Sequence, residues 1–370
     1  MDFKKVDEII EKYKSIGTPM ADCVVIYKGK TVYRKSYGYR DEAKTIPYDK
    51  DSRFWLYSCT KPITCTAAMR LVEEGKMSLS DPVSKYLPEF SNVTVQDEQG
   101  VHPAKETMLI QHLFSMTAGF TYDINSPCLK KAREDRSATT REVIKALSGD
   151  PLIFEPNTHF NYSLCHDVLA AVVEVVSGMK FSEYLKQLIF EPLGMNNTAF
   201  HKGNEKIENM CDQYYFDNGK ILKNNGVNGY VFTDKYESGG AGLVSTVDDY
   251  VKFASCLANY GVTKEGYRIL SHSSINTMRT NMLDTQRRNG FWKEHYGYGL
   301  GVRTMIDPPE GSYIPIGEYG WDGAACSYVS ISPDDNIAIV FGTHVLGFGR
   351  GYELHFELCN AVHEAIKGDK

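Results

Sequence analysis

The sequence contains no stretch that approaches the roughly 18 consecutive apolar residues that a membrane-spanning helix requires. It also has no excess of basic residues, because 41 Lys and Arg stand against 47 Asp and Glu and give a net charge of −6. Proteins that bind nucleic acid usually carry basic patches, so this balance disfavours nucleic acid as a partner. A share of 42% hydrophobic and 24% charged residues is instead typical of an ordinary globular protein.

Paired cysteines and clustered metal ligands are also missing. The nine cysteines are an odd number and include no CxxC pair, a pattern that fits reduced thiols in the cytosol better than a disulfide framework. The ten histidines show neither HExxH nor another metal-ligand spacing. We therefore expect no metal and no other cofactor.

The first residues form an amphipathic pattern rather than the apolar core of a signal peptide. Apolar side chains recur at helical spacing among charges, namely at Phe3, Val6, Ile9, Ile10 and Tyr13. This pattern predicts a surface helix, and with it a cytoplasmic location.

Strand patterns lie near the two ends of the chain and helical patterns lie between them. Residues 23–39 read as two strands joined by a tight turn, and three further strand patterns fall within 299–344. We predict an α/β (α+β) fold, an antiparallel sheet flanked by helices with an inserted, mostly helical domain. The sheet domain would comprise residues 1–80 plus 240–370 and the insert 81–239, with the active site in the cleft between them.

A serine lies three residues before a lysine at Ser58-Cys59-Thr60-Lys61, where a helical pattern begins. Residues three apart face the same way on a helix, so the hydroxyl and the amine can meet. The spacing alone is weak, because about two such pairs are expected by chance in this chain. Indeed, Ser177 and Lys180 form another pair.

Six longer stretches resemble the serine β-lactamase and penicillin-binding-protein superfamily in order and in content. The closest resemblance is to the branch of class C β-lactamases, D-alanyl-D-alanine carboxypeptidases and family VIII esterases. These stretches are residues 52–65, 71–90, 109–120, 154–178, 191–200 and 239–253. The resemblance covers nearly the whole chain and implies the sheet-plus-helical-insert fold and acylation of a serine.

The resemblance also implies roles for particular residues. Ser58 matches the nucleophile, Lys61 the lysine that serves as general base, and Tyr162 the tyrosine that serves as general base or acid. The backbone N–H of Ala324, with that of Ser58, matches the oxyanion donors. The chemistry agrees, because a serine hydroxyl barely ionises at neutral pH and needs a base such as a desolvated lysine or a stabilised phenolate. The alternatives are a solvated helix lysine at Lys61 and a packed surface aromatic at Tyr162.

Two departures from the family pattern bear on the substrate. The second motif usually ends in asparagine, which helps to bind the substrate amide, and Leu164 stands there instead. The third motif usually supplies a cation that engages a substrate carboxylate, and residues 320–324 read Gly-Trp-Asp-Gly-Ala. Trp321, Asp322 and Gly323 match the Trp-x-Gly that family VIII esterases carry there.

These departures favour an ester without a carboxylate. Asp322 would repel a carboxylate at 4 Å by on the order of 1 kcal/mol in water, whereas Trp321 offers a flat apolar wall. The alternative roles for Asp322 are binding of a cationic amine and capping of the turn into the strand. Aromatic residues in loops that could line the mouth of the cleft are Phe120, Tyr122, Tyr236 and Trp292. The residues that we assign to substrate binding are Trp321, Asp322, Gly323, Leu164 and Tyr122.

The function predicted from the sequence is that of a serine hydrolase that forms an acyl-enzyme on Ser58, most specifically a carboxylesterase. Its partner would be a small-molecule ester or amide. The alternatives are β-lactamase or D-amino-acid peptidase or amidase activity and, in another class, a catalytically weak binder of peptidoglycan fragments or of a protein partner.

Overall fold

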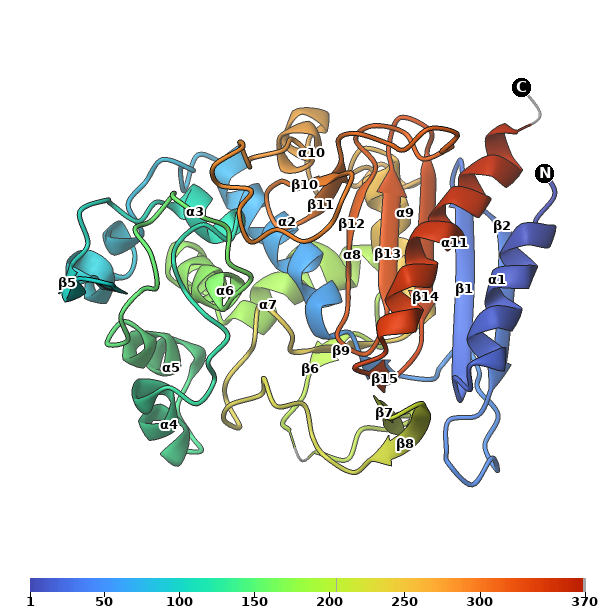
Figure 1. Ribbon diagram of the computed structural model, residues 1–370, viewed down its shortest axis with the longest axis horizontal. Helices are drawn as coiled ribbons and strands as arrows, with labels where there is room; N and C mark the ends of the chain where they lie inside the picture. The colour runs from blue at the N-terminus through green and yellow to red at the C-terminus, as the bar shows by residue number, and fades with distance from the viewer. Residues whose placement is uncertain (204, 369–370) are drawn as a thin grey trace.

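The computed structural model describes residues 1–203 and 205–368, and its largest element is a seven-stranded, fully antiparallel sheet (Figure 1). In sheet order the strands are β10 (Tyr296–Tyr298), β11 (Arg303–Met305), β12 (Tyr319–Asp322), β13 (Tyr328–Ser332), β14 (Ile337–Gly342), β1 (Met20–Tyr27) and β2 (Lys30–Gly38). This arrangement with helices on both faces confirms the predicted fold class.

The central strands are apolar along nearly their whole length because both faces of the sheet are covered. In β1, Cys23 and Val25 face a core that includes α1 (Lys4–Ser15) and α11 (Gly349–Lys367). Val24 and Ile26 face the opposite core, which includes α2 (Thr60–Glu73) and α9 (Val247–Ala258). Figure 1 shows α1 and α11 side by side on one face of the sheet. Successive side chains of a strand point to opposite faces, which explains why neighbouring residues of β1 contact different cores.

The remaining helices lie beyond the second face of the sheet or in connections. They are α3 (Ile110–Phe114), α4 (Pro127–Glu134), α5 (Thr140–Leu147), α6 (Cys165–Ser177), α7 (Phe181–Leu185), α8 (Glu191–Leu193) and α10 (His272–Met278). The chain also contains the short 3₁₀ helices η1 (Tyr57–Cys59), η2 (Val83–Lys85) and η3 (Pro88–Asn92) and the π-helical turn η4 (Lys186–Phe190). Within the described residues no helix combines the length and the apolar character needed to cross a bilayer.

Residues 81–239 contain more strand than the sequence patterns indicated. Among the described residues, three small sheets lie outside the main one. They are β3 (Phe54–Trp55) with β9 (Leu243–Ser245) and β6 (Ala199–Phe200); β15 (Val345–Leu346) with β7 (Gln213–Asp217) and β8 (Lys220–Asn224); and β4 (Thr94–Asp97) with β5 (Gly100–Pro103). Through β6 and β7 the middle segment pairs directly with strands from the later part of the chain. The division into domains at residues 80 and 240 stays a prediction.

Helix α2 is the element that fixes the predicted nucleophile. Every residue from Thr60 to Met69 is buried, including a lysine, so the helix has no solvent face along most of its length. It packs against α6 and α7, on the face of the main sheet opposite to α11. The start of α2 is therefore held by tertiary packing, and a side chain placed there has little freedom.

A buried ion pair links β11 to the residue that precedes β12 in the main sheet. Arg303 Nη2 lies 3.1 Å from Glu318 Oε1, and both residues are almost fully buried. The guanidinium also lies between the rings of Tyr296 and Tyr328, 5.3 and 4.8 Å from their centroids.

We predict that Arg303→Met lowers the free energy of unfolding by about 3–5 kcal/mol, because Glu318 would keep a buried, unpaired carboxylate. Denaturant unfolding measures this change. The double variant Arg303→Met/Glu318→Gln should recover part of the loss, and equal stability of the single variant and the wild type would contradict the prediction.

Candidate active site

Ser58 lies in the turn η1, immediately before α2, where the backbone is strained. Tyr57 has a φ of +46°, a left-handed conformation that a bulky residue rarely adopts. Its hydroxyl accepts a hydrogen bond of 2.6 Å from Gln213 Nε2, and its ring meets that of Tyr230 edge-on. These contacts hold the turn that presents Ser58 to a pocket.

Lys61 lies one turn further along and is fully buried. Its Nζ is 3.0 Å from Ser58 Oγ, 2.8 Å from the Tyr122 hydroxyl and 2.7 Å from the carbonyl oxygen of Gly240. Burial lowers the pKa of Lys61 to about 7, because desolvation penalises the ammonium more than nearby Asp167 stabilises it. A neutral amine, whose lone pair can accept the Ser58 proton, is therefore populated near neutral pH.

Tyr162, from the loop before α6, completes this cluster. The Nζ of Lys61 is 4.6 Å from the centroid of its ring, and its hydroxyl accepts a hydrogen bond of 2.8 Å from Trp321 Nε1. Burial raises the pKa of Tyr162 well above its usual value, although hydrogen bonds with Ser58 and Trp321 oppose the change. The hydroxyl is thus protonated at neutral pH. The structure places Ser58, Lys61 and Tyr162 together, as the sequence predicts.

Gly323 and Ala324 line the same pocket, where β12 ends. The hydroxyl of Tyr352, at the start of α11, lies 3.0 Å from the Gly323 carbonyl oxygen and 2.7 Å from that of Ala324. A trans peptide directs its N–H opposite to its C=O, so the contact with the Gly323 carbonyl turns the Ala324 N–H away from Tyr352. Tyr352 therefore orients the peptide of the predicted oxyanion donor.

The pocket has a volume of about 490 Å³, and half of the residues that line it are aromatic. The residues that line it are Ser58, Tyr122, Tyr162, Tyr230, Trp292, Lys293, Trp321, Asp322, Gly323, Ala324, Gly349 and Tyr352. The ring centroids of Trp292 and Trp321 are 5.7 and 5.3 Å from that of Tyr162. These rings form apolar walls beside Ser58, suited to an acyl or aryl group.

Asp322 does not present a free negative charge to this pocket, in contrast to the sequence-based expectation. One carboxylate oxygen accepts a hydrogen bond of 2.7 Å from His355 Nδ1, and the other lies 2.7 Å from Lys293 Nζ. Burial by itself would raise the pKa of Asp322, but Lys293, His355 and Arg303 outweigh it and lower the pKa. The carboxylate is ionised, and a lysine from another loop compensates its charge.

The family model described as Beta-lactamase matches residues 6–357. The chain belongs to the Beta-lactamase family.

The chain is also similar to a curated relative in sequence and to solved structures in fold. Protein Rv1367c of Mycobacterium tuberculosis is 29% identical over 336 residues, which are 86% of this chain and 84% of that protein. The fold resembles that of EstCE1, a hydrolase with promiscuous acyltransferase activity, with a TM-score of 0.83, 24% identity and coverage of 97% and 98% of the two chains. It also resembles an octameric penicillin-binding protein homologue from Pyrococcus abyssi, with a TM-score of 0.74, 24% identity and coverage of 100% and 78%.

Leu164 lies away from the pocket of this Beta-lactamase family member, although the sequence analysis assigned it to substrate binding. Its side chain is 1% exposed and packs in the apolar core at the start of α6. Phe120 and Tyr236 are likewise buried, and of the four candidate aromatics Tyr122 and Trp292 reach the pocket. An apolar residue at the family's asparagine position is thus explained by core packing.

Two residues beside Lys61 were not predicted from the sequence. One is Gly240, whose carbonyl oxygen accepts a hydrogen bond from Lys61 Nζ. The other is Asp167, which is 1% exposed and accepts hydrogen bonds from Tyr236 and Ser238. It lies so close to Gly240 that a Cβ on that glycine would be 2.6 Å from Asp167 Oδ2. A charged residue inside the apolar run of α6 was the signal that could have identified Asp167.

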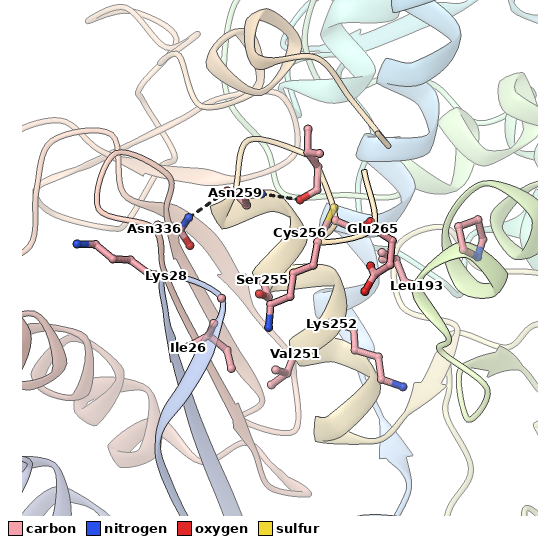
Figure 2. Close-up of a pocket in the computed structure, with 15 residues that line it drawn as sticks. Ile26, Lys28, Leu193, Val251, Lys252, Ser255, Cys256, Asn259, Glu265 and Asn336 are labelled. Atoms are coloured by element: carbon pink, nitrogen blue, oxygen red, sulfur yellow. Dashed lines mark hydrogen bonds between the residues drawn. The ribbon is translucent and has the colours of Figure 1, made fainter. Parts of the chain in front are cut away.

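Another pocket, of about 430 Å³, lies between the β1–β2 turn and α9 (Figure 2). Its walls include Lys28, Lys252 and Lys264, and Asn336 hydrogen-bonds across it to Asn259. None of the predicted catalytic residues contributes to it. In the described part of the chain no group of three His, Cys, Asp or Glu side chains is arranged to hold a metal ion.

We predict that Gly323→Ala lowers both the melting temperature and the rate of nitrophenyl ester hydrolysis, the latter roughly a hundredfold or more. A Cβ at Gly323 would lie 2.1 Å from Ser327 Oγ and 2.4 Å from the Leu56 carbonyl oxygen, so the segment before Ala324 must shift. Gly229→Ala is the matched control, since a Cβ there meets no atom within 4 Å. A fully active Gly323→Ala variant would contradict a role for this segment.

Proposed function

We propose that this protein is a serine hydrolase that cleaves carboxylic esters through an acyl-enzyme on Ser58. The observation that carries the proposal is the contact of 3.0 Å between Ser58 Oγ and the buried Nζ of Lys61, whose pKa is lowered to about 7. A serine beside a partly neutral amine has the base that it needs to become a nucleophile. The aromatic walls beside it favour ester substrates with an apolar part.

In the acylation step the Ser58 Oγ attacks the ester carbonyl carbon while its proton passes to Lys61 Nζ. Negative charge develops on the carbonyl oxygen, and the backbone N–H groups of Ser58 and Ala324 are the proposed donors to it. The C–O bond then breaks, and the alcohol leaves with the proton that Lys61 received. The protonated Tyr162 hydroxyl is placed to relay that proton.

In the deacylation step a water molecule repeats this sequence on the acyl-enzyme. Its proton passes to the same base, its oxygen attacks the acyl carbon, and Ser58 departs as the leaving group with its proton restored. The products are the carboxylic acid and the free enzyme. An alcohol in place of this water would give acyl transfer by the same steps.

Cleavage of β-lactams or D-amino-acid amides is the second candidate, because the cluster around Ser58 suits any acyl transfer. Membership of the Beta-lactamase family supports this candidate. The third-motif Trp-Asp-Gly, however, resembles that of family VIII esterases. We therefore place ester hydrolysis first and test both substrate classes together.

We predict that Ser58→Ala lowers hydrolysis of 4-nitrophenyl butyrate by at least about a thousandfold and abolishes labelling by a fluorophosphonate. The matched control is Ser177→Ala, which removes the serine of the other Ser-x-x-Lys pair and should keep both activities. Labelling that persists in Ser58→Ala would place the nucleophile elsewhere. A wild-type protein that is neither labelled nor active would favour the binding protein instead.

A parallel assay with a chromogenic cephalosporin separates the two substrate classes. Faster cleavage of the cephalosporin than of the ester, lost in Ser58→Ala, would replace the esterase proposal by the second candidate.

We predict that kcat/KM for a neutral ester rises with pH through about 7 and then levels off, because Lys61 must lose its proton to act as the base. The sign follows from the lowered pKa, since the neutral amine is the reactive form and gains population as pH increases. A pH profile from about 5 to 10 measures the midpoint. A rise that begins only above about pH 9 would instead indicate that the Tyr162 phenolate is the base.

A further inference from the structure

Lys293 is a cation in the wall of the pocket that the sequence motifs did not reveal. It lies in the loop before β10, next to Trp292, and lines the same pocket as Ser58. Its Nζ is 2.7 Å from Asp322 Oδ2 and 5.9 Å from the centroid of the Trp321 ring. A lysine from a different loop thus stands beside the position where the third motif of the family usually has its cation.

The two members of this ion pair are not equally accessible from the pocket. The Asp322 side chain is 9% exposed, and each of its oxygens is engaged, one by His355 and one by Lys293. The Lys293 side chain is 23% exposed, and this ion pair is the one that its ammonium makes among the described residues. An ammonium has three N–H donors, so the pair leaves donors for a ligand. A molecule in the pocket therefore meets the cation more readily than the anion.

The surroundings keep Lys293 in this place. Asp322 is fixed from behind by His355 on α11, and Arg303 contributes further positive potential. Trp321 is 2% exposed, and the centroid of its ring lies 5.9 Å from Lys293 Nζ. It covers one side of the lysine, which strengthens a charge interaction there. Glu318 is fully buried and paired with Arg303, and Glu294, which follows Lys293 in the chain, is exposed to solvent.

We propose that Lys293 selects esters that carry a carboxylate, which it binds while the aromatic walls hold the chain between that carboxylate and the scissile carbonyl. This inference rests on the proposed esterase function and reverses the repulsion that Asp322 alone would cause. The substrate class is a mono-ester of a dicarboxylic acid, or an ester whose alcohol part bears the carboxylate.

The test compares matched esters that differ in charge at the far end of the acyl chain. These are the 4-nitrophenyl mono-ester of adipic acid, its neutral methyl ester and 4-nitrophenyl 6-aminohexanoate. The measured quantity is the ratio of kcat/KM for the anionic ester to that for the neutral one. A second pair, 3-carboxy-4-nitrophenyl butyrate and 4-nitrophenyl butyrate, places the carboxylate on the alcohol side.

We expect Lys293→Met to lower the anionic-to-neutral ratio by about ten- to hundredfold in at least one pair, and Lys293→Arg to restore most of it. The ratio in the wild type should also fall as salt is raised, because the attraction is screened. Lys50→Met is the control for net charge, since Lys50 is exposed and outside the pocket. It should leave the ratio unchanged.

Lys293→Met leaves the Asp322 carboxylate without its lysine partner, and this variant alone can fail to fold. The double variant Lys293→Met/Asp322→Asn avoids that problem. It removes both charges, and its ratio should fall as well. A ratio that neither variant changes in either pair would overturn the role of Lys293, as would a wild-type preference for the aminohexanoate, which would assign recognition to Asp322. Inactivity of the wild type on all the esters would overturn the proposed function itself.

Discussion

The burial of one ammonium group, that of Lys61, is the constraint on which the site depends. A lysine removed from water is costly unless its donors are satisfied, and here three oxygens surround the nitrogen. Those oxygens come from η1, from the loop after α3 and from the segment before β9, so three distant parts of the chain must converge. The same burial that demands these partners also lowers the pKa of Lys61 and makes the amine chemically useful.

Behind this lysine lies a second buried charge that balances the first. Asp167 lies within Coulombic reach of Lys61, and burial raises its pKa although Ser238, Tyr236 and Lys61 oppose the change. Gly240 separates the two groups, and a side chain there would meet Asp167 at 2.6 Å and Lys61 at 3.4 Å. Because glycine has no side chain, the Asp167 carboxyl group and the Lys61 amine can both lie against this position, where a larger residue would not fit. The balance between these charges sets how much of Lys61 is neutral.

The sequence predicted those features that depend on residues close together in the chain, such as long strands and short catalytic motifs. It did not predict features that depend on contacts between distant residues. The apolar runs of β1, β13 and β14 predicted a covered sheet, and Ser58, Lys61 and Tyr162 were recognised by short motifs in their own neighbourhoods. The strands β6 to β8 have only two to five residues each, too few for a period to stand out. Lys293 carried no signal, because a lone lysine in a loop acquires meaning only when folding brings it to Asp322. Leu164 was misread for a related reason, since its position in a motif said nothing of which way its side chain points.

The pairing of β1 with β14 joins residues that are far apart in the chain, with Asp22 opposite Gly342. During synthesis β1 has β2 beside it at once, but its other edge stays unpaired until β14 has emerged from the ribosome, more than 300 residues later. Over that interval an apolar strand that is buried on both faces in the finished protein remains uncovered. An unpaired apolar strand can pair with other chains, so we expect aggregation to compete with folding during this interval. The same late step brings β12, with Trp321 and Asp322, to Ser58, and the pocket is assembled only when the sheet closes.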